Sequence, residues 1–163
     1  MKHRKGHIIV ALLMTAIFML SGCATSPKTF DTEHISVTLT KEFTNSSMEG
    51  FDSYIKSDDV VFTAKQEKIQ ELEAAGYEIS SLNDYCMELL SLNNVSSTEL
   101  KERDDYKYFV NSQTVNGSKY TYVHCMFESK DSFWICEFVC KSKHYDKYED
   151  KIFKWADSIE IKD

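Results

Sequence analysis

Short stretches in which apolar and polar residues alternate recur along the chain, and this period of two predicts half-buried β-strands. Residues 35–39 give the first stretch, in which aliphatic side chains alternate with hydroxyls. Residues 51–56 give a weaker one, and a polar turn at Ser57-Asp58-Asp59 connects it to residues 60–64. We therefore expect one strand followed by a hairpin.

Three further strands are predicted in the C-terminal half, at residues 106–114, 119–127 and 133–140. Asn116-Gly117 joins the first two, and both residues tolerate the positive φ that a type I′ hairpin turn requires. The third strand is apolar at nearly every position, which predicts a central strand with both faces covered.

Helices are predicted between and after these strands. Residues 65–75 have a helical composition and stop at Gly76, a favourable residue just beyond a helix end. Residues 81–92 begin with Ser81 as N-cap. Their apolar residues fall on one helix face, namely Leu82, Tyr85, Cys86, Leu89 and Leu90. Residues 144–157 carry a second such stripe, of Tyr145, Tyr148, Ile152 and Trp155, and a short strand at 159–161 closes the chain.

The order of these elements is a strand pair, helices, a three-stranded meander, a helix and a strand. Strands and helices that are grouped in this way predict an α+β fold with an antiparallel sheet of about six strands sandwiched by helices. We assign residues 35–163 to this single domain, since no internal repeat or low-complexity segment divides it.

The N-terminus has the pattern of a lipoprotein signal peptide. Three basic residues lie within the first seven positions, and residues 8–20 form an uncharged, mostly apolar run. This run is shorter than the roughly 20 residues of a membrane-spanning helix. It ends in Leu20-Ser21-Gly22-Cys23, which matches a bacterial lipobox. We predict removal of residues 1–22, acylation of Cys23 and a tether over residues 23–34; a plain signal peptide before an incidental cysteine is the alternative.

Removal of the leader makes the charge of the chain more negative. The whole chain has 19 basic and 26 acidic residues, and the leader holds three of the basic ones, so the mature charge is 16 − 26 = −10. An acidic surface repels phosphate backbones and anionic headgroups, which argues against nucleic-acid binding and against a domain lying on the bilayer. We expect an extracytoplasmic domain that contacts the cell membrane through the lipid on Cys23, within the roughly 35 Å reach of its tether.

The chain resembles the PsbP-like group of α/β/α-sandwich proteins and their bacterial lipoprotein relatives. The likeness rests on the leader and on features spread over residues 30–161: the opening strand before Phe43, the hairpin Phe109…Asn116-Gly117…Tyr122, the Phe133-Trp134 strand, and the closing helix into Ser158-Ile159. The resemblance implies a non-enzymatic binding or assembly module. It is one of pattern, so it assigns no site residue to this chain.

Four cysteines remain after Cys23, namely Cys86, Cys125, Cys136 and Cys140. One antiparallel register places Cys125 opposite Cys136, and Cys86 faces the core from its helix. Even numbers of cysteines suggest disulfides in an exported domain, with Cys125–Cys136 the first candidate pair and Cys86–Cys140 the second. We expect instead four buried thiols that behave as small apolar side chains.

No pattern of metal ligation or catalysis is present. A metal site would draw on Cys125, Cys136, Cys140 and His144, but their spacing matches no zinc motif, so no metal or cofactor is predicted. The register above sets His124 beside Glu137. We interpret them as a cross-strand pair on a solvated face rather than as a base with its orienting carboxylate. The sequence has no Gly-x-Ser-x-Gly motif and no phosphate-binding glycine loop, and we expect no enzyme.

Six tyrosines cluster in the C-terminal half: Tyr106, Tyr108, Tyr120, Tyr122, Tyr145 and Tyr148. Tyrosine is favoured in contact surfaces, although these residues could equally rim the core with their hydroxyls in water. The expected function is a membrane-anchored binding or assembly lipoprotein that recognises another cell-envelope protein. The alternative is a small-ligand carrier with a pocket between the sheet and the helix at residues 81–92.

Overall fold

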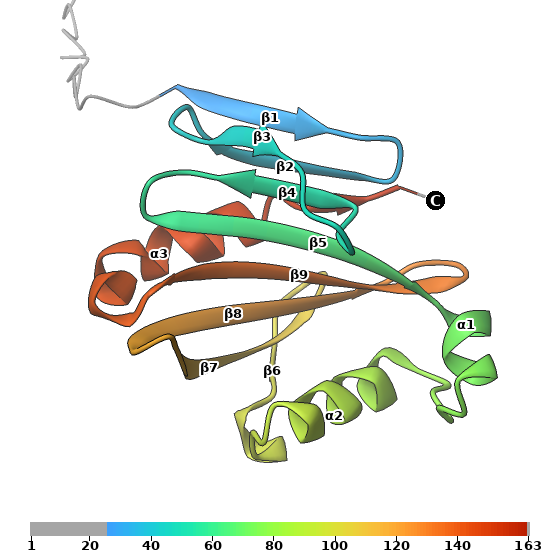
Figure 1. The fold of residues 1–163 in the computed structure, drawn as a ribbon. Helices are drawn as coiled ribbons and strands as arrows, with labels where there is room; N and C mark the ends of the chain where they lie inside the picture. The colour runs from blue at the N-terminus through green and yellow to red at the C-terminus, as the bar shows by residue number, and fades with distance from the viewer. Residues whose placement is uncertain (1–25, 163) are drawn as a thin grey trace, which may run out of the picture.

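The computed structural model describes residues 26–162, and a seven-stranded antiparallel sheet forms its centre (Figure 1). The strand order is β3-β4-β5-β9-β8-β7-β6. The strands are β3 (Thr44–Ser46), β4 (Ser53–Lys56), β5 (Val60–Lys68), β6 (Lys101–Glu102), β7 (Lys107–Val115), β8 (Ser118–Glu128) and β9 (Ser132–Lys141). Both predicted hairpins, β4–β5 and β7–β8, are present, and Asn116 and Gly117 have the expected positive φ values of 49° and 77°.

A second, smaller sheet has the order β1-β2-β10, from Pro27–Asp31, Ile35–Thr40 and Glu160–Ile161. Residues 27–31 were expected in the tether, because they contain a single large apolar residue and show no alternation. They form a strand because Phe30 is buried opposite Val37 in the β1–β2 pair. The structured domain therefore begins at least eight residues before the predicted boundary at residue 35. The lipobox and Cys23 lie outside the described residues.

Helices cover the two faces of the large sheet, so the predicted α+β sandwich is confirmed. Helix α3 (Tyr145–Ala156) packs with the small sheet on one face, where Phe62, Phe138, Ile152 and Trp155 belong to one core cluster. Helix α2 (Leu82–Leu92) packs on the other face at one end of the sheet. Ser81 caps α2 as predicted, because its Oγ accepts the Asp84 N–H at 3.2 Å. No helix of residues 26–162 is long and apolar enough to cross a membrane.

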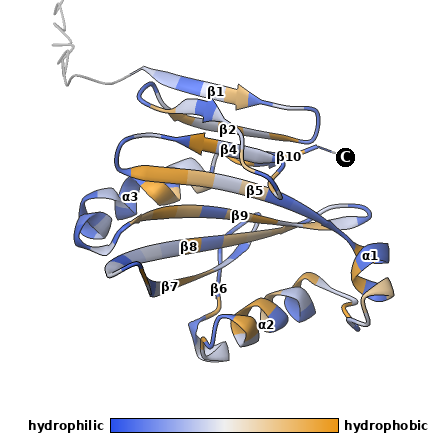
Figure 2. Cartoon of the chain, viewed as in Figure 1, coloured by the Kyte–Doolittle hydropathy of each residue, from blue (hydrophilic) through white to orange (hydrophobic). Residues whose placement is uncertain are grey.

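The predicted helix at residues 65–75 begins too early, because its first four residues are strand. Strand β5 continues through Lys68, where it pairs with Ser132, and α1 contains only Ile69–Ala74. The polar residues of this stretch favour a helix in isolation, but β5 forms nine consecutive residue pairs with β9, and this pairing keeps residues 65–68 in an extended conformation. Figure 2 shows the two halves of β5, hydrophobic toward Val60 and hydrophilic toward Lys68. The 3₁₀ turns Ser97–Glu99 and Ser142–His144 complete the fold.

Strand β9 is central as predicted, since it lies between β5 and β8, but its two faces differ. Trp134, Cys136, Phe138 and Cys140 point into the α3 core and are buried. On the opposite face, only Phe133 lies in the α2 cluster, and Ile135, Glu137 and Val139 are half-buried. The prediction that both faces of β9 are covered thus holds over only part of the strand, because α2 reaches one end of it.

Candidate functional site

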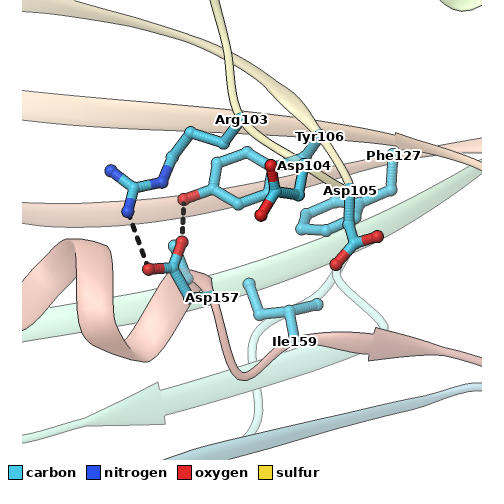
Figure 3. A pocket seen from close by; sticks show the side chains of 8 residues that line it. Arg103, Asp104, Asp105, Tyr106, Phe127, Asp157 and Ile159 are labelled. Atoms are coloured by element: carbon cyan, nitrogen blue, oxygen red, sulfur yellow. Dashed lines mark hydrogen bonds and ion pairs between the residues drawn. The ribbon is translucent and has the colours of Figure 1, made fainter.

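A cleft of about 380 Å³ lies where the C-terminal end of α3 meets the turn before β7 (Figure 3). The β6–β7 turn brings Arg103 and Tyr106 to this cleft, and the end of α3 brings Asp157. Arg103 Nη2 donates to Asp157 Oδ2 at 2.8 Å, and the Tyr106 hydroxyl donates to Asp157 Oδ1 at 2.9 Å. Asp104 and Asp105 flank this triad, and Figure 3 shows their carboxylates at the cleft beside Ile159.

In this triad, Arg103 and Tyr106 both donate hydrogen bonds to the Asp157 carboxylate. None of the three side chains is suited to act as a base that removes a proton from a substrate. Burial raises the pKa of Tyr106 far above its ordinary value, and the Asp157 carboxylate that accepts its hydrogen bond adds to the increase. Tyr106 therefore stays a hydrogen-bond donor. The Arg103 guanidinium lies 5.2 Å from the centre of the Phe153 ring, which fixes its direction. The carboxylates of Asp104 and Asp105 could accept hydrogen bonds from a cationic or hydroxyl group that enters the cleft. Sequence reasoning missed this cleft because residues 95–105 are mostly polar and show no helix or strand periodicity; the one available signal was Arg103-Asp104-Asp105 directly before a strand.

His124 and Glu137 are neighbours across β8 and β9, as the predicted register requires. His124 Nδ1 lies 2.7 Å from Glu137 Oε1, at ion-pair distance. The pair is not on a solvated face, however, since His124 is only 2% exposed and its ring stacks on Phe109 with centroids 4.3 Å apart. The expectation of a solvated pair was wrong because the rings of Phe109 and Tyr122 stack on the imidazole.

A chain of side-chain amides connects His124 to α2. His124 Nε2 contacts Asn111 Oδ1 at 3.2 Å, and Asn111 Nδ2 donates to Asn93 Oδ1 at 3.3 Å. Asn93, the C-cap of α2, donates in turn to the Leu89 carbonyl at 2.9 Å. Nε2 of His124 thus has a hydrogen-bonding partner, whereas Nδ1 is close to Glu137 without a well-oriented hydrogen bond to it. This arrangement favours a structural link between the sheet and α2 over a catalytic base.

Beyond α2, the same face of the sheet carries half-buried apolar and tyrosine side chains. We call this surface the open face; it consists of Tyr54, Val61, Tyr120, Tyr122, Ile135 and Val139. Strand pairing makes it continuous, because Val139 lies between Val61 and Tyr122 in adjacent strands. Tyrosine and β-branched side chains that are half exposed on a sheet are the composition of a contact surface.

The six tyrosines of the C-terminal half divide between the two faces. Tyr106 is buried, and Tyr108, Tyr145 and Tyr148 pack partly buried against the α3 core. Tyr120 and Tyr122 lie on the open face. Four of the six tyrosines therefore belong to the core or its rim. The other two, Tyr120 and Tyr122, are placed where a contact surface would need them.

A second cleft, of about 230 Å³, lies where the β4–β5 turn meets the start of α3. The Tyr148 hydroxyl donates to Asp59 Oδ2 at 2.7 Å, and His144 Nδ1 lies 3.3 Å from Asp59 Oδ1. The hydrogen bond from Tyr148 is the main reason why the pKa of Asp59 is lower than usual. His144 is thus near a carboxylate rather than in the Cys125, Cys136 and Cys140 set that a metal site would need. Among residues 26–162, no group of three or more potential metal ligands is found.

We expect Tyr148→Phe to raise the pKa of Asp59 toward its ordinary value, because the phenol donates to the ionised carboxylate. The folded-state pKa of Asp59 is depressed, so the contact stabilises the fold above the unfolded-state pKa and this contribution disappears as the pH falls through the folded-state value. Carboxyl-carbon NMR over an acid titration measures the shift. Tyr145→Phe is the control, because that hydroxyl donates to Glu149 instead. An Asp59 pKa that is equal in both variants would contradict the assignment.

The four cysteines of the domain are buried free thiols in the structure. Cys125 and Cys136 are direct cross-strand partners, as the first candidate disulfide requires. The second candidate pair is wrong: Cys86 lies in the α2 cluster and Cys140 in the α3 cluster, so the sheet separates them. Burial raises the pKa of all four thiols, that of Cys86 to about 12.

We expect these thiols to resist alkylation in the native state at pH 8, because little thiolate forms and reagents cannot enter the core. A chain that starts at residue 24 should take up four alkyl groups in 8 M urea without reductant, as intact mass would show. Uptake of two groups, restored to four by prior reduction, would instead place a Cys125–Cys136 disulfide in the sheet. Rapid uptake in the native state would contradict the burial of the thiols.

The space that the carrier alternative needs, between α2 and the sheet, is filled by side chains. Tyr85 stacks on Phe133 with ring centroids 4.8 Å apart, and Cys86, Leu90, Phe109 and Met126 are buried around them. The Tyr85 hydroxyl donates to Glu67 Oε2 at 2.9 Å, which closes the end of this layer. Small-ligand sites are concave and mostly apolar. The cleft at Asp157 is instead lined largely by charged and polar groups, and the smaller cleft at Asp59 combines valines with charged side chains.

Comparison with solved structures identifies the fold. Three similar structures are a protein from Bacteroides thetaiotaomicron (TM-score 0.55, 15% identity), the cyanobacterial PsbP protein CyanoP from Synechocystis (0.50, 9%), and LpqN (0.50, 10%), which is involved in cell envelope biogenesis of Mycobacterium tuberculosis. The alignments cover 79%, 85% and 85% of this chain, and 45%, 94% and 90% of the other chains. This chain thus spans less than half of the Bacteroides protein. No protein-family model and no curated protein sequence matches it.

These likenesses confirm the resemblance that the sequence suggested. The domain has the PsbP-like fold, and two proteins that share it match over nearly their full length. At 9–15% identity the comparison establishes the fold alone. No residue of the clefts or of the open face is assigned by it.

Proposed function

We propose that this chain is a membrane-anchored, non-enzymatic lipoprotein whose domain binds another protein of the cell envelope. The anchor rests on the lipobox Leu20-Ser21-Gly22-Cys23, which follows a basic and then an apolar segment. Two or three acyl chains on one residue exceed the single chain that gives only reversible membrane binding.

The open face is the observation that carries the proposal. Its tyrosine, valine and isoleucine side chains are half exposed on paired strands, and they adjoin the polar network of His124 and Glu137. Rigid aromatic side chains with a polar end lose little conformational entropy on contact, which suits a protein interface. The involvement of LpqN in cell envelope biogenesis gives an analogy for such a role on this fold.

Crosslinking in intact cells that produce the full-length chain tests the proposal. We expect one defined protein adduct that is lost from the Tyr122→Glu variant, because a charge at the centre of the open face prevents its desolvation. Tyr77→Glu is the matched control, since Tyr77 is exposed in the connection between α1 and α2. The absence of any adduct, or an adduct that both variants lose equally, would overturn the proposal. Release of Cys23→Ser from the membrane fraction tests the anchor separately.

A further inference from the structure

Strand β7 leaves most of its outer edge unpaired. It lies near one border of the large sheet, and β6 pairs only with Lys107 and Tyr108. Within residues 26–162, the stretch from Phe109 to Val115 therefore has β8 as its single strand partner. An unpaired edge exposes backbone donors and acceptors that another strand can use.

The hydrogen-bond pattern shows which backbone groups point outward. The Arg103 N–H donates to the Tyr106 carbonyl at 2.9 Å, which closes the β6–β7 hairpin and turns Tyr106 toward β6. Because antiparallel strands alternate, the N–H and C=O groups of Val110, Ser112 and Thr114 face the same outer edge. Ser112 and Thr114 are exposed and Val110 is half-buried, so these groups are accessible.

This edge lacks the features that protect most edge strands. Residues 109–115 contain no charged residue and no proline. The opposite border of the sheet is different, because β3 has only three residues and follows Lys41 and Glu42. The exposed Val115 and the exposed Leu92 of α2 lie at the far end of the β7 edge, since Asn93 accepts a hydrogen bond from Gln113 at 3.2 Å.

The surroundings of the edge are acidic. Residues 69–100, which form α1, α2 and the turn leading to β6, contain six acidic residues and no lysine, arginine or histidine: Glu71, Glu73, Glu78, Asp84, Glu88 and Glu99. The C-terminal end of α2 brings this acidic layer to β7, where Asn93 contacts Asn111 and Gln113, whereas α1 lies against β5. Asp104 and Asp105 add two further carboxylates at the turn before β7, and the basic residues that border the edge are Lys101, opposite Tyr108, and Lys119, opposite Thr114.

We propose that the outer edge of β7, at Val110–Thr114, binds an extended, lysine- or arginine-rich segment of another envelope protein as an additional β-strand. Backbone hydrogen bonds supply the attachment, and the acidic layer selects a cationic segment. The added strand lies next to Asn111 and Gln113 and so extends the surface that includes Tyr122. The proposal rests on the proposed function and names the element that receives the partner.

The variant Ser112→Pro tests the edge directly. Proline removes the outward N–H of residue 112 while the β7–β8 pairing keeps its hydrogen bonds, a position in which an edge strand tolerates proline. Ser112→Val is the matched control, because it also loses the Ser112 hydroxyl contact with Thr121 but keeps the N–H. The probe is a capped nine-residue peptide of alternating valine and lysine, titrated into the folded chain and followed by amide NMR.

We expect saturable binding that protects the amides of Val110, Ser112 and Thr114, weakens about tenfold in Ser112→Pro, and persists in Ser112→Val. No saturable binding up to 1 mM, equal binding by both variants, or equal binding of the same peptide with glutamate for lysine would overturn the proposal. A dimer that Ser112→Pro abolishes would also overturn it, in favour of a second copy at the edge. An envelope adduct that forms with Ser112→Pro but not with Tyr122→Glu would remove the edge proposal and leave the proposed function intact.

Discussion

Replacing Phe138 with alanine lowers the free energy of unfolding by about 3–5 kcal/mol, the largest single loss that we expect in this domain. Phe138 lies in the middle of β9 and is fully buried, at 0% exposure. Its ring is 4.9 Å from that of Phe62 and 6.1 Å from that of Trp155, centroid to centroid. It therefore joins two strands of the sheet to α3, and its removal leaves a cavity that rigid strands cannot close.

Urea denaturation followed by tryptophan fluorescence and by circular dichroism measures this loss. Phe51→Ala is the matched control, since the same ring is removed from a side chain that is 36% exposed, and we expect less than about 1 kcal/mol there. Equal losses in the two variants would mean that α3 does not pack on the sheet through Phe138.

The second large effect concerns the other face of the sheet. Leu90→Ala should cost about 2–4 kcal/mol, because Leu90 is 1% exposed and packs in the cluster that attaches α2 to the sheet. Leu92→Ala, two residues further along the same helix, removes the same atoms from a side chain that is 62% exposed. Its expected cost is below about 0.5 kcal/mol.

The comparison of Leu90→Ala with Leu92→Ala also distinguishes an effect on the stability of the fold from an effect on partner binding at the β7 edge. Amide hydrogen exchange would show whether α2 opens locally in Leu90→Ala before the sheet does. A stable Leu90→Ala variant would contradict the packing of α2 and reopen the space that a carrier pocket needs. We expect Leu92→Ala to fold normally and to weaken only contacts made at the end of the β7 edge.

The strands that bury one face were the most predictable part of the fold. Alternation located β2 and β8 to within about one residue, and Asn116-Gly117 located the β7–β8 turn, because local sequence determines both. The pairing of Cys125 with Cys136 depends instead on the turn at residues 129–131, which joins β8 to β9, and the structure has the register that sets the two cysteines opposite each other.

The failures arose where distant residues decide the structure. Residues 65–68 are strand because β9 pairs with them, and residues 27–31 are strand because β2 does. The cleft at Asp157 brings together residues about fifty positions apart, so no local pattern marks it. Burial of His124 likewise depends on Phe109 of the neighbouring strand, whose ring stacks on the imidazole, and periodicity does not reveal this contact.

The early start of β1 has a consequence for how the domain stands on a membrane. With Cys23 acylated, only residues 24–26 separate the lipid from Pro27, and four residue steps reach at most about 14 Å. Figure 1 shows β1 at one end of the molecule and α2 with β7 at the other, so β1 would be the part of the domain nearest the membrane. The edge of β7 and the acidic layer would then point away from the bilayer, where a passing polypeptide meets them first and where headgroups compete least for its lysines.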